Sequence, residues 1–124
     1  MIKANQKQIN NAYTSLAYLS RLKLPIKVSY DLYKMVKIME EKFNFSVEEE
    51  KKLLACHNGT VDEQGVIHFK DGDSVAKFNK EHEELLALEH DLDIDPVIVD
   101  MNTVDDQRIS ITDIINLEGF VSFK

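Results

Sequence analysis

Three aspartates in this sequence have the spacing of a metal-binding loop. Asp91, Asp93 and Asp95 alternate with aliphatic residues, as the first ligands of a calcium loop do. Such a loop also needs glycine at its sixth position and glutamate at its twelfth, where this chain has Pro96 and Asn102. Because proline fixes φ at about −65°, it cannot make the sharp turn. The pattern therefore predicts a solvated acidic loop and not a calcium site.

The single cysteine and the four histidines form no metal or catalytic motif. Zinc takes about four nitrogen or sulfur ligands, whereas His57, His68, His82 and His90 are scattered and the sequence has no HExxH motif. Cys56 and His57 are adjacent, and neighbouring side chains on a helix diverge by about 100°, so the imidazole is not placed to activate the thiol. We expect no catalytic residue, no metal and no other cofactor, and hence a protein that is not an enzyme.

The composition is that of an ordinary globular protein, with 44% hydrophobic and 30% charged residues. A chain of 124 residues predicts one domain, 1–124. No apolar run approaches the roughly 20 residues that cross a bilayer, and the N-terminus lacks the apolar segment of a secretory signal. A single cysteine gives no internal disulfide. We therefore expect a cytoplasmic protein that does not bind a membrane.

Charge is unevenly distributed along the chain, whose net charge is −7. Residues 1–42 hold eight Lys or Arg and three Asp or Glu, whereas 43–124 hold seven and nineteen. The segment 81–107 has ten acidic residues and no Lys or Arg. Such a segment repels nucleic acid and attracts a basic protein surface. We expect a protein partner, no nucleic acid partner, and a binding surface formed by Glu81, Glu84, Asp91, Asp93, Asp95, Asp100, Asp105 and Asp106.

Two N-terminal helices are the clearest expected elements. Apolar residues three and four apart predict a helix over 6–20 with Asn5 as its N-cap, and a second helix that starts at Pro25. The short connection between them favours an antiparallel hairpin. Ser46 and Glu49 have the pattern of a capping box at the start of a further helix. The segment 25–57 is therefore either one kinked helix or two.

The C-terminal half combines short strands with helices. Thr60–Val61 and Val66–Phe69 flank a turn at Gly65, which predicts a β-hairpin. A helix capped by Asp73 or Ser74 is expected to run to about residue 89. Residues 96–99 and 108–109 have the composition of strands, and a capping box at 110–113 starts a helix over 111–117.

Together these elements predict an α+β fold, in which an N-terminal antiparallel helical hairpin and further helices pack on a small antiparallel β-sheet. That sheet would join 60–61, 66–69 and 96–99. The expected core consists of Leu16, Leu32, Met35, Met39, Leu53, Phe69, Phe78, Leu85 and Ile98.

Four segments of the chain resemble a group of small acidic proteins encoded by phages and prophages of Gram-positive bacteria. They are the helix entry LPIKVSY at 24–30, the charged run at 48–54, FNKEHEELL at 78–86 and the acidic-aliphatic segment 92–99. The sequence departs from that group at its C-terminus, which is GFVSFK in place of a strongly acidic tail. The resemblance implies a phage setting and supplies no mechanism.

The function expected from these observations is protein binding. One version is a phage-encoded inhibitor of a host protein, such as a defence protein, that acts through its acidic surface. The alternative is a virion assembly factor or minor structural protein, and a small enzyme is the third class. Lys23, Lys27, Lys34 and Lys37 are candidates for a nucleic-acid patch, but no aromatic stacking platform accompanies them, so we expect them to neutralise the acidic half of the fold. We also expect self-association through Tyr13, Tyr18, Tyr30 and Tyr33.

Overall fold

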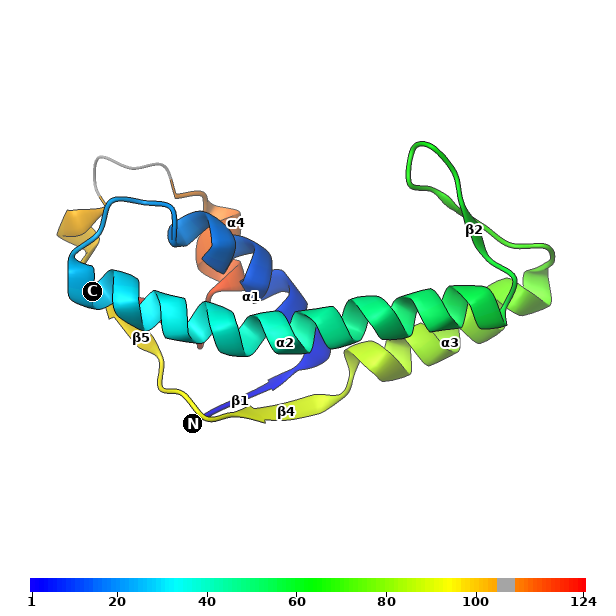
Figure 1. Ribbon diagram of the computed structural model, residues 1–124, viewed down its shortest axis with the longest axis horizontal. Coiled ribbons are helices and arrows are strands. Elements are labelled where there is room, and N and C mark those ends of the chain that lie inside the picture. Colours follow the sequence, from blue (N-terminus) through cyan, green and yellow to red (C-terminus); the bar gives the residue numbers. More distant parts are fainter. Residues whose placement is uncertain (105–108) are drawn as a thin grey trace.

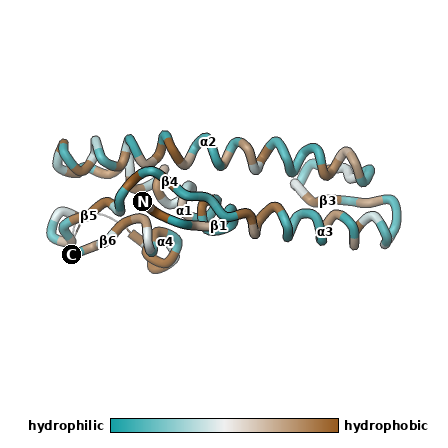
Figure 2. Tube along the Cα trace, turned by 90° about the horizontal axis from the view of Figure 1, so that it is seen from below, coloured by the Kyte–Doolittle hydropathy of each residue, from teal (hydrophilic) through white to brown (hydrophobic). Residues whose placement is uncertain are grey.

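The computed structural model describes residues 1–104 and 109–124. One long helix, α2 (Ile26–Cys56), runs through both parts of the molecule (Figure 1). Its first half belongs to a body with α1 (Gln6–Leu19), α4 (Ile111–Asn116) and most of the strands. Its second half lies beside α3 (Gly72–Leu86) and forms an arm that extends from the body in both views (Figures 1 and 2). No helix in the described part of the chain is long and apolar enough to span a membrane.

Helix α1 has the extent and the cap that its sequence predicts. Asn5 and Gln8 form a capping box, in which each side chain accepts a hydrogen bond from the other residue's backbone N–H at 2.8 Å. The apolar stripe of α1 is fully buried and packs against the first half of α2, where Leu32, Met35 and Met39 are fully buried as well. These two stripes form the centre of the body.

The segment 25–57 is one helix, so the predicted capping box at Ser46 is wrong. Ser46 is buried in the middle of α2, and its hydroxyl accepts a hydrogen bond from Asn10 Nδ2 at 3.0 Å. The ring of Phe43 stacks on Tyr13 of α1, with ring centroids 4.5 Å apart. Tertiary contacts therefore hold the polar stretch of α2 in helical conformation, although its local pattern suggests a break.

The strands form three separate two-stranded sheets. β1 (Ile2–Asn5) pairs antiparallel with β4 (Glu89–Leu92), and β2 (Thr60–Val61) pairs antiparallel with β3 (Ile67–His68), which confirms the predicted hairpin. β5 (Val97–Val99) pairs with β6 (Val121–Phe123) in parallel. The expected single sheet is wrong, because the β2–β3 hairpin stands at the tip of the arm and β5 lies in the body (Figure 1).

Two boundaries in the second half also differ from the expectation. α3 starts two or three residues earlier, with Asp71 as its N-cap, and ends at Leu86 because residues 89–92 pair with β1. His90 is consequently on a strand, not on the helix that carries His82. The capping box of α4 is confirmed. The strand expected at 108–109 lies partly outside the described residues.

The expected core is correct for six of its nine members. Leu53 and Phe69 are half-buried, and Ile98 is 58% exposed. Successive side chains on a strand alternate between its faces, so burial of Val97 and Val99 turns Ile98 outward. The core residues that the sequence pattern missed come from strands and the C-terminal segment: Ile2, Ala4, Leu92, Val97, Val99, Leu117, Phe120 and Val121.

Candidate functional site

The arm leaves several of its apolar residues open to solvent, among them Phe45, Val75 and Leu88. The chain reverses through β2 and β3, so α3 runs back along α2 (Figure 1). Phe78 and Leu85 of α3 are buried in the seam between the helices. The ring of Phe78 lies 5.0 Å from that of Phe69 and 5.3 Å from that of His82, measured between centroids. Two helices alone bury one seam and leave their other sides open.

Two histidine–glutamate contacts connect the helices of the arm. His57 Nε2, at the end of α2, lies 3.1 Å from Glu81 Oε2 of α3. His82 Nε2 of α3 lies 3.4 Å from Glu50 Oε2 of α2. His82 is thus a hydrogen-bonded histidine at the edge of an apolar cluster. The ring nitrogen Nε2 of His57 is thus engaged with Glu81, and the thiol of the neighbouring Cys56 is exposed.

A groove of about 340 Å³ lies on one side of the arm, between α2 and α3. Phe45 and Leu88 line it and are 42% and 44% exposed. Two exposed apolar side chains bordered by charge make this groove a candidate interaction site. We call it the arm groove: its apolar residues are Phe45, Leu53, Leu85 and Leu88, and its acidic rim is Glu49, Glu81 and Glu84.

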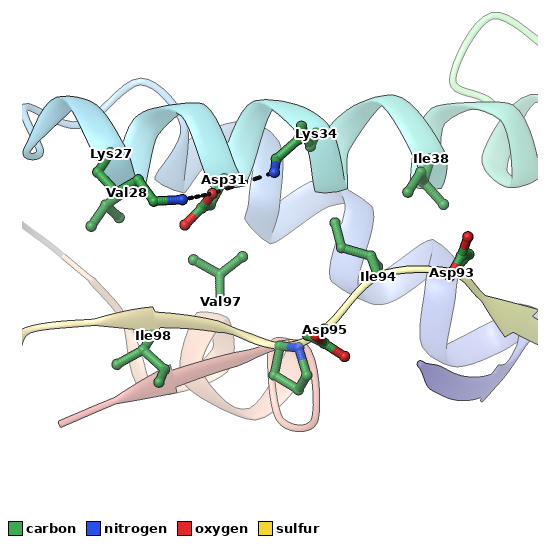
Figure 3. Close-up of a pocket in the computed structure, with 11 residues that line it drawn as sticks. Lys27, Val28, Asp31, Lys34, Ile38, Asp93, Ile94, Asp95, Val97 and Ile98 are labelled. Atoms are coloured by element: carbon green, nitrogen blue, oxygen red, sulfur yellow. Dashed lines mark hydrogen bonds and ion pairs between the residues drawn. The ribbon is translucent and has the colours of Figure 1, made fainter.

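A second, larger pocket of about 540 Å³ lies in the body, between α2 and the segment that leads into β5 (Figure 3). Asp31 Oδ1 accepts from Lys27 Nζ at 2.9 Å and lies 3.7 Å from Lys34 Nζ. Asp93 and Asp95 line the other wall. The hydrogen bond from Lys27 is the main cause of the lowered pKa of Asp31. The Asp31 carboxyl is therefore ionised at neutral pH and unsuited to donate a proton.

Four of the eight residues expected in the acidic surface are divided between these two places. Glu81 and Glu84 border the arm groove, whereas Asp93 and Asp95 line the body pocket with two lysines. Asp95 Oδ1 also accepts from the N-terminal ammonium at 3.0 Å. The remaining members lie elsewhere: Asp91 is opposite Lys3 in the β1–β4 pair, Asp100 caps the 3₁₀ helix Met101–Thr103, and Asp105 and Asp106 lie outside the described residues.

The four tyrosines expected at a self-association surface have different environments. Tyr13 is half-buried against Phe43 of α2, and Tyr18 on α1 is 38% exposed. Tyr30 and Tyr33, on the first half of α2, are 57% and 55% exposed. Only the last two combine wide exposure with a place on one helix, three residues apart.

A buried polar network that the sequence did not predict joins the body to the start of the arm. Gln6 is fully buried, and its Nε2 donates to Asn10 Oδ1 at 2.9 Å and to the backbone carbonyl of Lys42 at 3.0 Å. Since both amide hydrogens are used, Gln6 Oε1 is the acceptor of the 2.8 Å contact with His90, which assigns a proton to His90 Nε2. A glutamine on a polar helix start gives no sequence signal for this role.

The protonation of His90 is expected to destabilise the fold. Burial, and secondarily Lys42, lowers the pKa of His90 below its ordinary value of 6.5. The unfolded chain then takes up the proton more readily, so this contribution to stability is present above about pH 6.5 and lost as the pH falls below it. His90→Gln keeps a donor toward Gln6 and does not titrate.

Urea denaturation at about pH 7.5 and about pH 5 measures this effect. The free energy of unfolding of the wild type should exceed that of His90→Gln by less at the lower pH than at the higher pH. His57, His68 and His82 each face a carboxylate and are the same in both proteins, so the difference between the two proteins isolates position 90. An advantage that does not change with pH would contradict the role of His90.

Among residues 1–104 and 109–124, no three His, Cys, Asp or Glu side chains are grouped as metal ligands would be. Comparisons with known protein families, with curated proteins and with solved structures find no match to this chain.

Proposed function

We propose that the protein is a non-enzymatic, phage-encoded protein-binding factor that inhibits a host protein, such as a defence protein, in the cytoplasm of the infected bacterium. The observation that carries this proposal is the arm groove, in which exposed Phe45 and Leu88 lie beside the carboxylates of Glu49 and Glu84. Buried apolar contacts supply most of the affinity at an interface, and the charges on its edge steer the encounter. The phage setting comes from the resemblance of the sequence.

The groove favours a partner with apolar side chains flanked by Lys or Arg. An amphipathic helix that lays its apolar side into a helix-lined groove is a common form of such recognition. In this proposal the predicted antiparallel hairpin of α1 and the first half of α2 is the scaffold that presents the arm.

The alternative is a virion assembly factor or minor structural protein. Its support is a second exposed apolar region on α4, where Ile111, Ile114 and Ile115 are 76%, 47% and 63% exposed. In this alternative, the exposed apolar residues of the arm and those of α4 each contact a neighbouring subunit. Genes for head and tail proteins beside this gene, and the protein in purified virions by mass spectrometry, would favour the assembly role.

A pair of charge-reversed variants tests the arm groove. Glu49→Lys with Glu84→Lys changes its rim, and Asp91→Lys with Asp93→Lys makes the same change of net charge in the body. The probe is a synthetic helical peptide with leucines on one side and lysines flanking them. We expect the arm variant to raise the Kd of the peptide about tenfold or more, and the body variant to have a much smaller effect.

Added salt should weaken binding by the wild type, because it screens the rim carboxylates. Fluorescence anisotropy measures both effects, and capture from host lysate with the same two variants then identifies the natural partner. If the arm and body variants lose the same amount of affinity for the peptide, net charge alone attracts it and the arm groove is not its binding site.

A further inference from the structure

The outer side of α2 in the body carries an arranged group of aromatic and basic residues. Tyr30 and Tyr33 stack with ring centroids 6.4 Å apart and remain more than half exposed. Lys34 Nζ lies 5.0 Å from the centre of the Tyr30 ring, and Lys37 Nζ lies 5.8 Å from that of Tyr33. We call these four residues the tyrosine–lysine stripe. Their mutual contacts reduce the side-chain freedom that a binding partner would otherwise have to restrict.

The two tyrosines of the stripe belong to a residue type that is enriched at interfaces. Tyrosine is enriched where proteins bind one another, because it adds a large contact area and a hydroxyl with little loss of conformational freedom. The stripe lies opposite Leu32 and Met35, the side of α2 that the core covers. Since α-helices have 3.6 residues per turn, the stripe and the side with Phe45 and Glu49 are about a quarter of a turn apart.

The stripe and the arm groove match in charge and in polarity. The stripe presents two aromatic rings and the ammonium of Lys37, while Lys34 also faces the Asp31 carboxylate. The groove presents the exposed side chains of Phe45 and Leu88 beside the carboxylates of Glu49 and Glu84. We propose that the tyrosine–lysine stripe of one copy of this protein binds in the arm groove of a second copy. This inference rests on the proposed function in one respect, that the same groove receives the partner.

The positions of the two surfaces determine the form of the assembly. Both lie on α2, but in different halves and on different sides of this rigid helix, so one copy cannot fill its own groove. Each copy offers one groove and one stripe, and the contact joins unlike surfaces. Head-to-tail contacts of this kind extend into chains or close into rings. A basic partner and a second copy compete for the groove, so partner binding would dissociate the assembly.

Two variants separate the surfaces. Tyr33→Ser with Lys37→Glu alters the stripe and leaves the groove intact, and Glu84→Lys with Leu88→Ser alters the groove and leaves the stripe intact. Lys7→Glu and Glu83→Lys are the matched controls, because both residues are exposed and lie outside the two surfaces. All the substituted side chains are exposed, and circular dichroism checks that each variant is folded.

Sedimentation equilibrium at protein concentrations up to the high micromolar range tests the proposal. The mass of the wild type and of both controls should rise above 14.3 kDa with concentration, whereas each surface variant should stay at 14.3 kDa. An equimolar mixture of the two surface variants should form a dimer and nothing larger, because one intact groove and one intact stripe remain for a single contact.

A wild type that remains at 14.3 kDa throughout would overturn the proposal. It would equally be overturned if the surface variants associate like the wild type, or if their mixture does not associate. The stripe variant keeps its groove, so its binding of the leucine–lysine peptide tests the proposed function separately. Self-association that maps to both surfaces with no peptide binding would leave this inference in place and remove the proposed function.

Discussion

Replacement of Leu32 or Met35 by alanine is expected to lower the free energy of unfolding by about 2–5 kcal/mol. Both side chains are fully buried on the side of α2 that packs against α1. Truncation removes apolar atoms from the core and leaves a cavity that the two packed helices close only in part. Because α2 belongs to both the body and the arm, the loss should appear in a transition that includes both.

Urea denaturation followed by circular dichroism measures this cost. Ile26→Ala is the matched control, since Ile26 is on the same helix and 87% exposed, and its effect should stay within about 0.5 kcal/mol. A loss below about half a kcal/mol at both Leu32 and Met35 would show that α2 does not hold the core together.

The helices could be predicted from the sequence because their signals are local. Asn5 and Ser110 cap α1 and α4 through residues three positions later, and apolar residues at helical spacing identify the buried side of α2. Ser46 shows the limit of such signals. The same pattern appears there, but the hydroxyl of Ser46 bonds to Asn10, which is distant in sequence, and the helix continues.

The strands of the body could not be predicted, because their pairing is between distant segments. Ile2–Asn5 is four residues long and has no distinctive composition, yet it pairs with Glu89–Leu92. β5 and β6 pair in parallel, and such pairing leaves no turn signal between the strands. The outward position of Ile98 follows from that pairing, so the local sequence pattern could not predict its exposure either.

The acidic half of the candidate site was visible in composition, and its apolar half was not. Glu81 and Glu84 belong to the long acidic segment, but the groove beside them exists only because α3 lies along Phe45 and Leu53 of α2. From the composition alone, Asp93 was expected to lie on one surface with Glu81 and Glu84. The fold instead places Asp93 across a pocket from Lys27 and Lys34, where opposite charges offset one another.

Replacement of Gln6 by leucine is expected to lower the free energy of unfolding by about 2–4 kcal/mol, although leucine is similar in size and more hydrophobic. The substitution leaves the Lys42 carbonyl, Asn10 Oδ1 and the proton on His90 Nε2 without their present partner inside the fold. A buried polar group that loses its hydrogen bond costs about 1–3 kcal/mol, more than the added apolar contact returns.

Lys7→Leu is the control for Gln6→Leu, because it introduces the same side chain at an exposed position on the same turn of α1. It should change the free energy of unfolding by less than about 0.5 kcal/mol.

A double-mutant cycle with His90→Leu separates the contribution of the network from that of packing. If the network acts as a unit, the two losses should fall short of additivity by about 0.5–3 kcal/mol, since the second substitution removes a group that the first has already left unsatisfied. Strict additivity, or a Gln6→Leu protein as stable as the wild type, would mean that water satisfies these groups as well as Gln6 does. The junction of α1, α2 and β4 would then depend on its apolar contacts alone.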